Sequence, residues 1–485
     1  MNERMRQAVV FGLAILSFLA PLKFNQPVIL DYLDVFPTDW LACFLGPWPN
    51  GIFYLLLVPL ALGGLGVGKW NADERRIVWL PIVFLTVQVL ASFKSVDPRA
   101  SHFTLWLFFS LGAGFMLGAR AIKTEADIQW IGLAWVLGGL VVAQNGLTQA
   151  LGGLQEMREY LYQHPELARV PELWHKVDSD RIFSTFVNPN ALGGYIAAAV
   201  FVIAAWSVSM RRSETRDVNH ESCNQKPSFF AKATGDKSAD RESRIQNLKS
   251  KISPSPNLWN ITVLSIAVIV ILLLLCCLWQ SQSKGAYATL FLSLIASVFL
   301  LVSRSRLALI GMVPVCAIAV LGFAVGYGQK AIKKGRITWE SRTDYWKAAW
   351  KISLKHPLLG TGPGTFSRVY PQYKPTEAEN TKLVHNNYLQ MGCDSGIFGF
   401  IAFLAWVPGA LGLWIYRWRL RPGAERLVPA LWWCACLSFA LHSLVDFNLY
   451  MISNSWPIFV MMGCLTTFRG DKKHVTRVTE SLGTE

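Results

Sequence analysis

Long apolar stretches alternate with short polar segments along almost the whole chain. Each apolar stretch holds about 20 residues, the length that an α-helix needs to cross the ~30 Å hydrocarbon core of a bilayer. We therefore expect an all-α polytopic membrane protein with about 12 transmembrane helices. These helices are placed at residues 8–22, 51–68, 77–93, 103–119, 129–150, 189–209, 259–279, 285–302, 307–327, 396–416, 427–443 and 448–468.

Three longer polar segments interrupt this pattern. Residues 151–188 have helical character around Leu154–Tyr162, and residues 211–258 are rich in Ser, Asn, Lys and Arg, which favours a disordered cytoplasmic linker. Residues 328–395 form a large external loop with helices of its own between spans 9 and 10. The expected order is spans 1–6 over 1–210, the linker 211–258, spans 7–9 over 259–327, the loop 328–395, spans 10–12 over 396–468 and a cytoplasmic tail 469–485.

Composition agrees with a membrane protein and offers little for a metal site. Hydrophobic residues make up 52% of the 485 and charged residues 16%, below the ~25% charged residues usual in soluble domains. The nine Cys lie mostly inside apolar stretches and form no CxxC pair, so we interpret them as small buried hydrophobic residues. His442 and Asp446, four apart, are expected to pair on one helix face as a structural hydrogen bond, because no third metal ligand is evident.

Basic residues predict which side of the membrane each loop faces. The short segments 69–76, 303–306 and 417–421 are rich in Lys and Arg, whereas loop 23–50 has one Lys against three Asp. Short basic loops stay in the cytoplasm, so both termini are expected there and the loop 328–395 outside. No small-x-small cleavage site follows the first apolar stretch, which we interpret as an uncleaved helix.

Four groups that are cationic, or can become so, are expected on the outer side. Arg181 precedes span 6, Lys284 lies between spans 7 and 8, and Arg342 and His385 lie in the large loop. Arg pairs bidentately with phosphate oxygens, and preorganised cations stabilise the charge that develops on a diphosphate leaving group. His can remove a proton from an attacking hydroxyl. The pattern therefore favours a site for an anionic, lipid-linked substrate.

Each of these residues also has a structural interpretation. A cation at a membrane boundary often extends to lipid headgroups, and His385 could cap the helix that follows it. The glycines of Gly360-Thr-Gly-Pro-Gly364 are followed by no Lys-Ser/Thr, so we interpret them as a turn that joins two loop helices rather than a phosphate cradle. Trp339, Trp346 and Trp350 lie near one helical face and are expected to dock on the membrane or the bundle.

As an ordered set, the motifs resemble the O-antigen ligase and polymerase superfamily of bacterial envelope glycan enzymes. The resemblance covers about residues 75–465, and the motifs that carry it are Arg181…Phe186-Val-Asn-Pro-Asn190, Ser283-Lys284-Gly285, Arg342…Trp346, His356-Pro-Leu-Leu-Gly-Thr-Gly-Pro-Gly364 and His385-Asn-Asn-Tyr-Leu389. It implies a C-type glycosyltransferase architecture in the bacterial inner membrane, with the active site on the periplasmic face. It also implies transfer of a glycan from an undecaprenyl-diphosphate carrier to an acceptor hydroxyl, without metal, nucleotide or other cofactor.

Carried over position by position, the resemblance implies a role for each candidate residue. Arg181 and Lys284 would hold the diphosphate, with Arg342 assisting, and His385 would act at the reacting centre. The family usually shows Ser-Arg-Gly/Ala where this chain has Ser283-Lys284-Gly285. Lys keeps the positive charge but loses the two-point grip of Arg on phosphate.

The sequence leaves the acceptor open. The implied partners are the lipid-linked glycan, membrane lipids and an acceptor such as a lipid A core or a second lipid-linked glycan, with protein O-glycosylation as a third version and nucleic acid not among them. A flippase or transporter of lipid-linked oligosaccharides is the alternative from another class. Transporters often carry internal repeats and charged residues at mid-membrane, and neither is evident in this sequence.

Overall fold

The computed structural model describes an all-helical chain. The residues that it describes are 1–28, 36–37, 39–66, 68–164, 179–186, 188–224, 256–302, 318, 336–376, 378–418 and 426–467. Seven helices are long and apolar enough to cross a membrane, and three shorter apolar helices accompany them within these residues. An all-helical, multi-pass membrane protein is thereby confirmed, whereas the full number of twelve spans stays a prediction.

Most of the expected spans correspond to a helix. In the N-terminal half these helices are α1 (Glu3–Lys23), α3 (Asn50–Leu65), α4 (Ala72–Ile77) with α5 (Trp79–Ser92), α6 (Pro98–Ala121), α7 (Glu125–Thr148) and α10 (Pro189–Asn224). In the C-terminal half they are α12 (Pro256–Ser281), α13 (Lys284–Val302), α17 (Asn387–Trp418), α18 (Leu427–His442) and α19 (Ile452–Thr467). The expected span 307–327 lies, apart from Ile318, outside the described residues.

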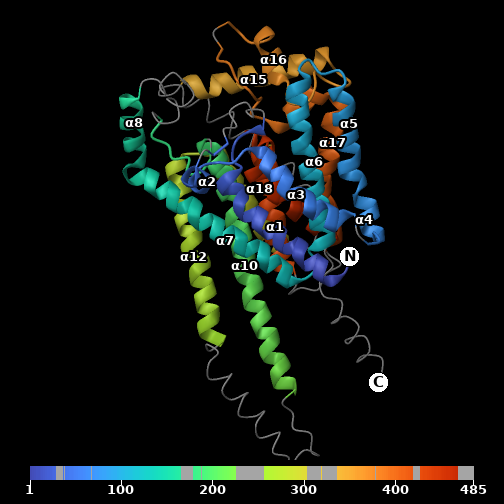
Figure 1. The fold of residues 1–485 in the computed structure, drawn as a ribbon, viewed down its shortest axis with the longest axis vertical. Helices are drawn as coiled ribbons and strands as arrows, with labels where there is room; N and C mark the ends of the chain where they lie inside the picture. Colours follow the sequence, from blue (N-terminus) through green and yellow to red (C-terminus); the bar gives the residue numbers. More distant parts are fainter. Residues whose placement is uncertain are drawn as a thin grey trace, which may run out of the picture.

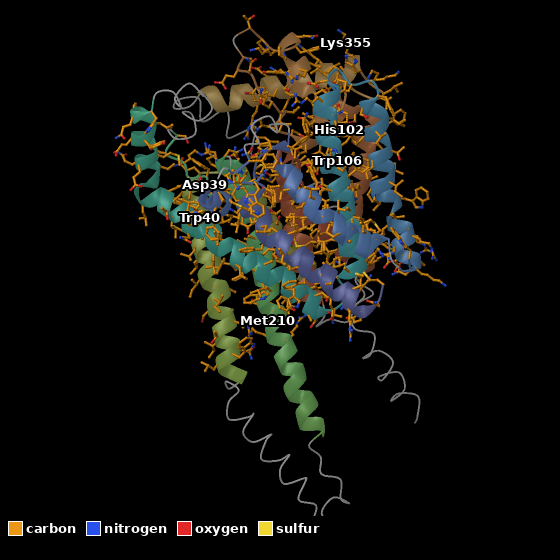
Figure 2. The ribbon with its side chains drawn as sticks, in the orientation of Figure 1. Asp39, Trp40, His102, Trp106, Met210 and Lys355 are labelled. Carbon is orange, nitrogen blue, oxygen red and sulfur yellow. The ribbon has the colours of Figure 1, made fainter. Side chains whose placement is uncertain are left out.

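The remaining helices lie in the segments between these apolar helices, and all but α15 are short. They are α2 (Trp40–Leu45), η2 (Gln149–Gly153), α8 (Leu154–Gln163), α15 (Arg336–Lys355), α16 (Phe366–Val369), η5 (Tyr370–Gln372) and η7 (Asn448–Tyr450). Figure 1 shows α15 lying across one end of the bundle, and α10 and α12 projecting beyond the bundle at the other. Lys355, on α15, and Met210, on α10, mark the two ends in Figure 2. The helical character expected near Leu154–Tyr162 is confirmed by α8.

Two element boundaries differ from the expected ones. Helix α17 begins nine residues before the expected start of span 10 and is broken at Gly396, whose combination of φ +65° and ψ −164° is adopted almost only by Gly. The expected span thus begins at the break, and residues 387–395 form a separate helical segment that belongs to the loop. Helix α10 continues to Asn224, into the stretch expected as a linker, whose residues 225–255 lie outside the described part.

The expected outer loops meet at the end covered by α15. The backbone N–H of Val96, after α5, donates to the carbonyl of Thr361 at 2.9 Å. Asn387 N donates to the carbonyl of Ser443 at 2.8 Å. Segments distant in sequence therefore share one polar surface, as alternating spans require.

Buried ion pairs join the expected inner loops at the opposite end. Arg120 Nη1 lies 3.1 Å from Glu74 Oε2, and Arg6 Nη1 lies 2.5 Å from Asp127 Oδ2. Both carboxylates also complete capping boxes, with Asn71 at the start of α4 and with Thr124 at the start of α7. Because a buried carboxylate is stable only when it is paired and hydrogen-bonded, these contacts hold α1, α4, α6 and α7 in register.

Helices α6 and α19 pack closely against each other at two glycines, Gly118 of α6 and Gly463 of α19. A Cβ at Gly118 would collide with the carbonyl oxygen of Val460, and one at Gly463 would collide with the carbonyl oxygen of Phe115. Small residues let transmembrane helices pack backbone to backbone where apolar solvent gives no hydrophobic drive for association. This contact buries Trp456, whose Nε1 donates to the carbonyl of Ser110 at 3.1 Å.

We expect Gly118→Ala to destabilise the protein by about 1–3 kcal/mol, because the added methyl group forces α6 away from α19. The matched control is Gly412→Ala, whose Cβ would meet nothing within 4 Å, so the better helix propensity of Ala should leave stability unchanged or raise it. Thermal unfolding of the two purified variants in detergent measures the difference. Equal stability of both variants would show that the α6–α19 contact is not tight.

Candidate active site

Polar side chains from distant segments surround Asp446, in the turn between α18 and η7. Its side chain is 2% exposed, and its Oδ1 lies 3.4 Å from Nδ1 of His385. The positive charges of Arg181 and Arg342 both act on this carboxylate. The structure thus brings three of the four candidate residues together around a carboxylate.

The pKa of Asp446 shows how strongly these neighbours act. Burial by itself would raise the pKa of this carboxyl, but His385, His442 and Arg342 outweigh that effect and lower it to about 2. Asp446 is therefore ionised at neutral pH. A buried carboxylate of this kind fixes the orientation of the cationic and hydrogen-bonding groups around it.

Arg181 is held between the end of α12 and the start of α10. Its Nε donates to the carbonyl of Ser281 at 2.8 Å, one of the carbonyls left without an intrahelical partner at the end of α12. Its Nη2 donates to Oδ1 of Asn190 at 2.9 Å. Burial lowers the pKa of Arg181 and so does the charge of Arg342, while Asp446 opposes both. Since the pKa of Arg lies far above neutrality, the guanidinium stays charged.

The motif around Asn190 has a local structural explanation. Asn188 Oδ1 accepts from Ala191 N at 2.8 Å and so caps α10. Pro189 occupies the first helical position, where its missing N–H is not needed. Asn190 then points its amide oxygen at Arg181. The Asn-Pro-Asn sequence therefore starts the helix and positions the arginine at once.

Arg342 reaches the site from α15. Burial lowers its pKa, whereas the charges of Asp446 and Tyr345 raise it. Tyr345, one helical turn further along, stacks its ring on His385 with centroids 5.9 Å apart and an interplanar angle of 26°. The helix that covers the end of the bundle thus contributes a cation and an aromatic wall to the same site.

His385 is held in a backbone conformation that is rare for its residue type. Its φ is +56°, in the left-handed region that costs energy outside Gly and often marks functional sites. The cap of α17 is Asn386, whose Oδ1 accepts from Tyr388 N and Leu389 N at 3.0 and 3.1 Å. Phe447 packs edge-on against the imidazole at 4.8 Å. The imidazole thus lies between the rings of Tyr345 and Phe447, and Asn386 rather than His385 caps the helix.

Lys284 lies at the rim of the site. It begins α13 and its side chain is exposed. The residues on either side of it pack against neighbouring helices. Ser283 faces α10, where a Cβ on Gly193 would lie 2.7 Å from the Cβ of Ser283. Gly285 faces α18, because a Cβ on it would lie 3.4 Å from Nε2 of His442. The short link is therefore pressed against α10 and α18, and the lysine extends toward solvent.

The expected hydrogen bond between His442 and Asp446 is replaced by two other contacts. Nδ1 of His442 lies 2.5 Å from Nδ2 of Asn448, whereas Asp446 pairs with His385. The reason is that α18 ends at His442, so that Asp446 lies in the following turn and no longer one helical turn away. Among the residues that the structure describes, no group of three His, Cys, Asp or Glu side chains could hold a metal ion.

The glycine-rich segment is a turn between α15 and α16, as expected. Thr361 N and Gly362 N donate to the carbonyls of Cys393 and Asp394 at 3.1 and 2.8 Å, and Gly364 N donates to Asp394 Oδ2 at 2.9 Å. These N–H groups are therefore occupied by α17 and are not directed at a ligand. The glycines at 360, 362 and 364 all have positive φ, which explains their residue type.

The three loop tryptophans, which were expected to dock on the membrane or the bundle, differ in their surroundings. Trp346 is half-buried and packs on the small core of the large loop, formed with Tyr345, Ile352 and Tyr370. Trp350 is 58% exposed, and the side chain of Trp339 lies outside the described part.

Sequence reasoning missed the central position of Asp446 and two of its neighbours. The sequence singled out Asp446 only as the expected partner of His442, although it is the single charged residue in the loop 444–447. Tyr345 and Asn387 carried no signal of their own. The amide of Asn387 and the hydroxyl of Ser443 are buried and have no hydrogen-bond partner among the described residues.

The fold and this cluster define a multi-pass helical membrane protein with a cationic site at one end of its bundle. Residues 269–404, from α12 to α17, match the O-antigen ligase family. This match confirms the resemblance to the O-antigen ligase and polymerase superfamily and supports an O-antigen ligase-like activity in general terms. The matched segment contains Lys284, Arg342 and His385, whereas Arg181 and Asp446 lie outside it. No curated protein matches the chain.

The low pKa of Asp446 predicts a specific loss of stability in acid. The folded-state pKa of about 2 lies below the ~3.9 of an unfolded Asp. The ionised Asp446 therefore stabilises the folded protein fully above about pH 4, and this contribution is lost as pH falls toward 2. We expect Asp446→Asn to flatten the stability profile between pH 4 and pH 2, measured by thermal unfolding in detergent. The exposed Asp180→Asn is the control, and an unchanged profile in Asp446→Asn would contradict this account.

Proposed function

We propose that the protein transfers a glycan from an undecaprenyl-diphosphate carrier to an acceptor hydroxyl at the outer face of the bacterial inner membrane. The observation that carries this proposal is the convergence of Arg181, Arg342 and His385 on the buried Asp446. It is supported by the O-antigen ligase family match, which includes two of these residues and Lys284. Cations beside a proton acceptor suit the departure of an anionic leaving group.

Arg181 and Lys284 hold the diphosphate, and Arg342 assists. Hydrogen bonds to the protein use Nε and Nη2 of Arg181, which leaves Nη1 for the diphosphate. Arg342, partly buried beside Asp446, adds positive charge where the leaving group gains negative charge. Lys284, on the exposed rim, contributes a point charge that follows the outer phosphate.

His385 accepts the proton of the acceptor hydroxyl. Asp446 beside Nδ1 keeps the proton of the neutral imidazole on that nitrogen, which leaves Nε2 as the base. The acceptor oxygen attacks the anomeric carbon and forms the new C–O bond, while the bond to the diphosphate oxygen breaks and its electron pair leaves with the diphosphate. Nε2 takes the hydroxyl proton. Asp446 is thus a positioning residue, and the reaction draws its free energy from the glycosyl diphosphate bond without a metal or other cofactor.

The acceptor is a lipid A core, a second lipid-linked glycan or a protein hydroxyl, and all three would use the same chemistry. Transport of lipid-linked oligosaccharides is not favoured. Arg181, His385 and Asp446 lie in segments between helices, and Arg342 lies on α15 of the large loop, whereas transporters bind their substrates near the middle of the membrane.

We expect Arg181→Ala and His385→Ala each to lower glycan transfer by a factor of about 10²–10⁴, because one removes the grip on the diphosphate and the other the base. Asp446→Asn should lower kcat with a smaller change in KM, since it alters the orientation of His385. The measurement is transfer from undecaprenyl-diphosphate-linked glycan by purified, reconstituted protein.

The matched control is Arg368→Ala, which removes an exposed arginine at the same end of the bundle, paired with Asp97. This variant should retain its activity. Full activity in both Arg181→Ala and His385→Ala would refute the proposal.

Orientation is tested by cysteine labelling from outside. We expect Thr376→Cys, in the exposed part of the large loop, to react with a membrane-impermeant maleimide added to the periplasmic side. Ala72→Cys, exposed at the opposite end, should react only after the inner membrane is opened. The exposed Cys43 and Cys276, and Cys223, are replaced by Ser in both variants. The reverse labelling pattern would place the site in the cytoplasm.

A further inference from the structure

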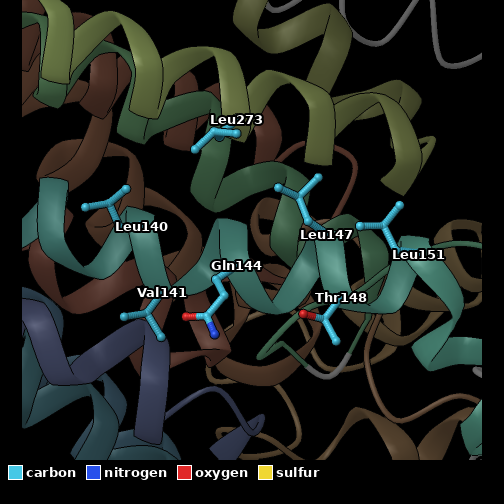
Figure 3. Close-up of a pocket in the computed structure, with 7 residues that line it drawn as sticks. All are labelled: Leu140, Val141, Gln144, Leu147, Thr148, Leu151 and Leu273. Carbon is cyan, nitrogen blue, oxygen red and sulfur yellow. The ribbon is translucent and has the colours of Figure 1, made fainter.

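An apolar groove runs along the side of α7 that faces α12. It has a volume of about 440 Å³, within the ~300–1,000 Å³ typical of small-molecule sites. Leu140, Gln144, Leu147 and Leu151 line it at the spacing of one helical face, and Leu273 of α12 lies opposite. Figure 3 shows Leu140 and Leu147 directed toward α12 and Leu273. Val141 and Thr148 of α7 complete the lining, so the groove is formed by five aliphatic side chains and two polar ones, Gln144 and Thr148.

The groove opens sideways, toward lipid, rather than into the bundle. Leu140 is 37% exposed and Leu151 is 87% exposed. Its floor is closed because α7 and α12 pack closely at two glycines. A Cβ on Gly139 would lie 3.3 Å from Leu274 Cδ1, and one on Gly146 would lie 2.8 Å from Cys277 Sγ. A chain-like apolar ligand can enter it laterally from the bilayer.

On the α7 side, the groove ends at the segment that carries Arg181. Gln149, the first residue of η2, accepts through Oε1 from Phe183 N and Ser184 N at 3.0 and 2.7 Å and donates through Nε2 to the Ser184 carbonyl at 3.0 Å. These three hydrogen bonds fix the segment to the end of α7. The helix is distorted at this point, because Gly152 has a φ of +131°, and such π-type interruptions are frequent at functional sites.

On the α12 side, the groove leads to the same arginine. Ser281, whose carbonyl accepts from Arg181 Nε, follows Leu273 by eight residues, which is about 12 Å along a helix. Both walls of the groove therefore converge on Arg181. A ligand with its charged head on Arg181 and a long apolar tail would place the first part of that tail between α7 and α12.

We infer that this groove binds the first isoprene units of the polyprenyl chain of the lipid-linked donor. The inference rests on the proposed function, which places the diphosphate at Arg181. The continuity of the groove with Arg181 selects this occupant, because an ordinary membrane lipid needs no fixed path to that residue. Donors thus enter from the bilayer between α7 and α12.

Photocrosslinking tests the occupant directly. Leu151→p-benzoylphenylalanine, at the exposed end of the groove, is compared with Leu272→p-benzoylphenylalanine, which is 59% exposed but does not line the groove. The full-length protein is placed in phosphatidylethanolamine–phosphatidylglycerol vesicles with radiolabelled undecaprenyl diphosphate. We expect several-fold more crosslinking at position 151, with competition by unlabelled undecaprenyl diphosphate but not by additional phosphatidylglycerol. Equal crosslinking at both positions, or displacement by phosphatidylglycerol, would overturn the inference.

Kinetics separate this inference from the proposed function. Leu273→Trp fills the groove and should raise KM for the undecaprenyl-linked donor about tenfold with little change in kcat, whereas Leu272→Trp, its neighbour on the lipid side, should have no effect. If the wild-type protein transfers glycan but both variants behave alike and crosslinking is equal, the groove assignment alone is wrong. If the wild-type protein transfers no glycan while crosslinking at position 151 is selective, the groove assignment stands and the proposed reaction is wrong.

Discussion

The candidate site depends on one buried carboxylate. Asp446 is 2% exposed, and an ionised carboxylate in that position is stable only when cations and hydrogen-bond donors surround it. His385, Arg342 and Arg181 provide that surrounding from three separate segments. The ion pair with His385 and the charges of Arg342 and Arg181 that stabilise Asp446 therefore come from the same groups that the proposed reaction needs. A site built in this way exists only when the large loop has docked on the bundle.

The rest of the fold keeps that docking surface rigid. At the opposite end, buried ion pairs such as Arg120–Glu74 hold the first helices together, and glycine contacts such as Gly118–Val460 join α6 to α19. At the site end, the glycine turn 360–364 uses its N–H groups to bind α17. It therefore contributes by fixing the loop in place, and the polar chemistry remains with α15, His385 and the turn at Asp446.

In the proposed reaction, the donor reaches the site along the groove beside α7. The groove beside α7 connects the bilayer with Arg181 through Gln149 and Ser281, so that an apolar tail and a diphosphate can be held at the same time. Tyr345 and Arg342 of α15 cover His385 from the other side. A lipid-linked substrate that is bound through its tail has its glycan–diphosphate bond held at a fixed depth in the membrane. This favours the positioned attack that glycosyl transfer requires.

The sequence alone determined the features that depend on local composition. Apolar stretches of sufficient length must form membrane helices because their backbone groups can be satisfied in lipid only within a helix, and the glycine turn followed from residues that tolerate positive φ. Arg181, Arg342 and His385 were singled out from motifs near predicted helix ends. Only the tertiary structure decided that Asp446 pairs with His385 rather than His442, that Asn386 caps α17, and that Lys284 lies at the rim. These outcomes depend on where α18 stops and how the loop docks, and such long-range packing leaves no periodic signal in the chain.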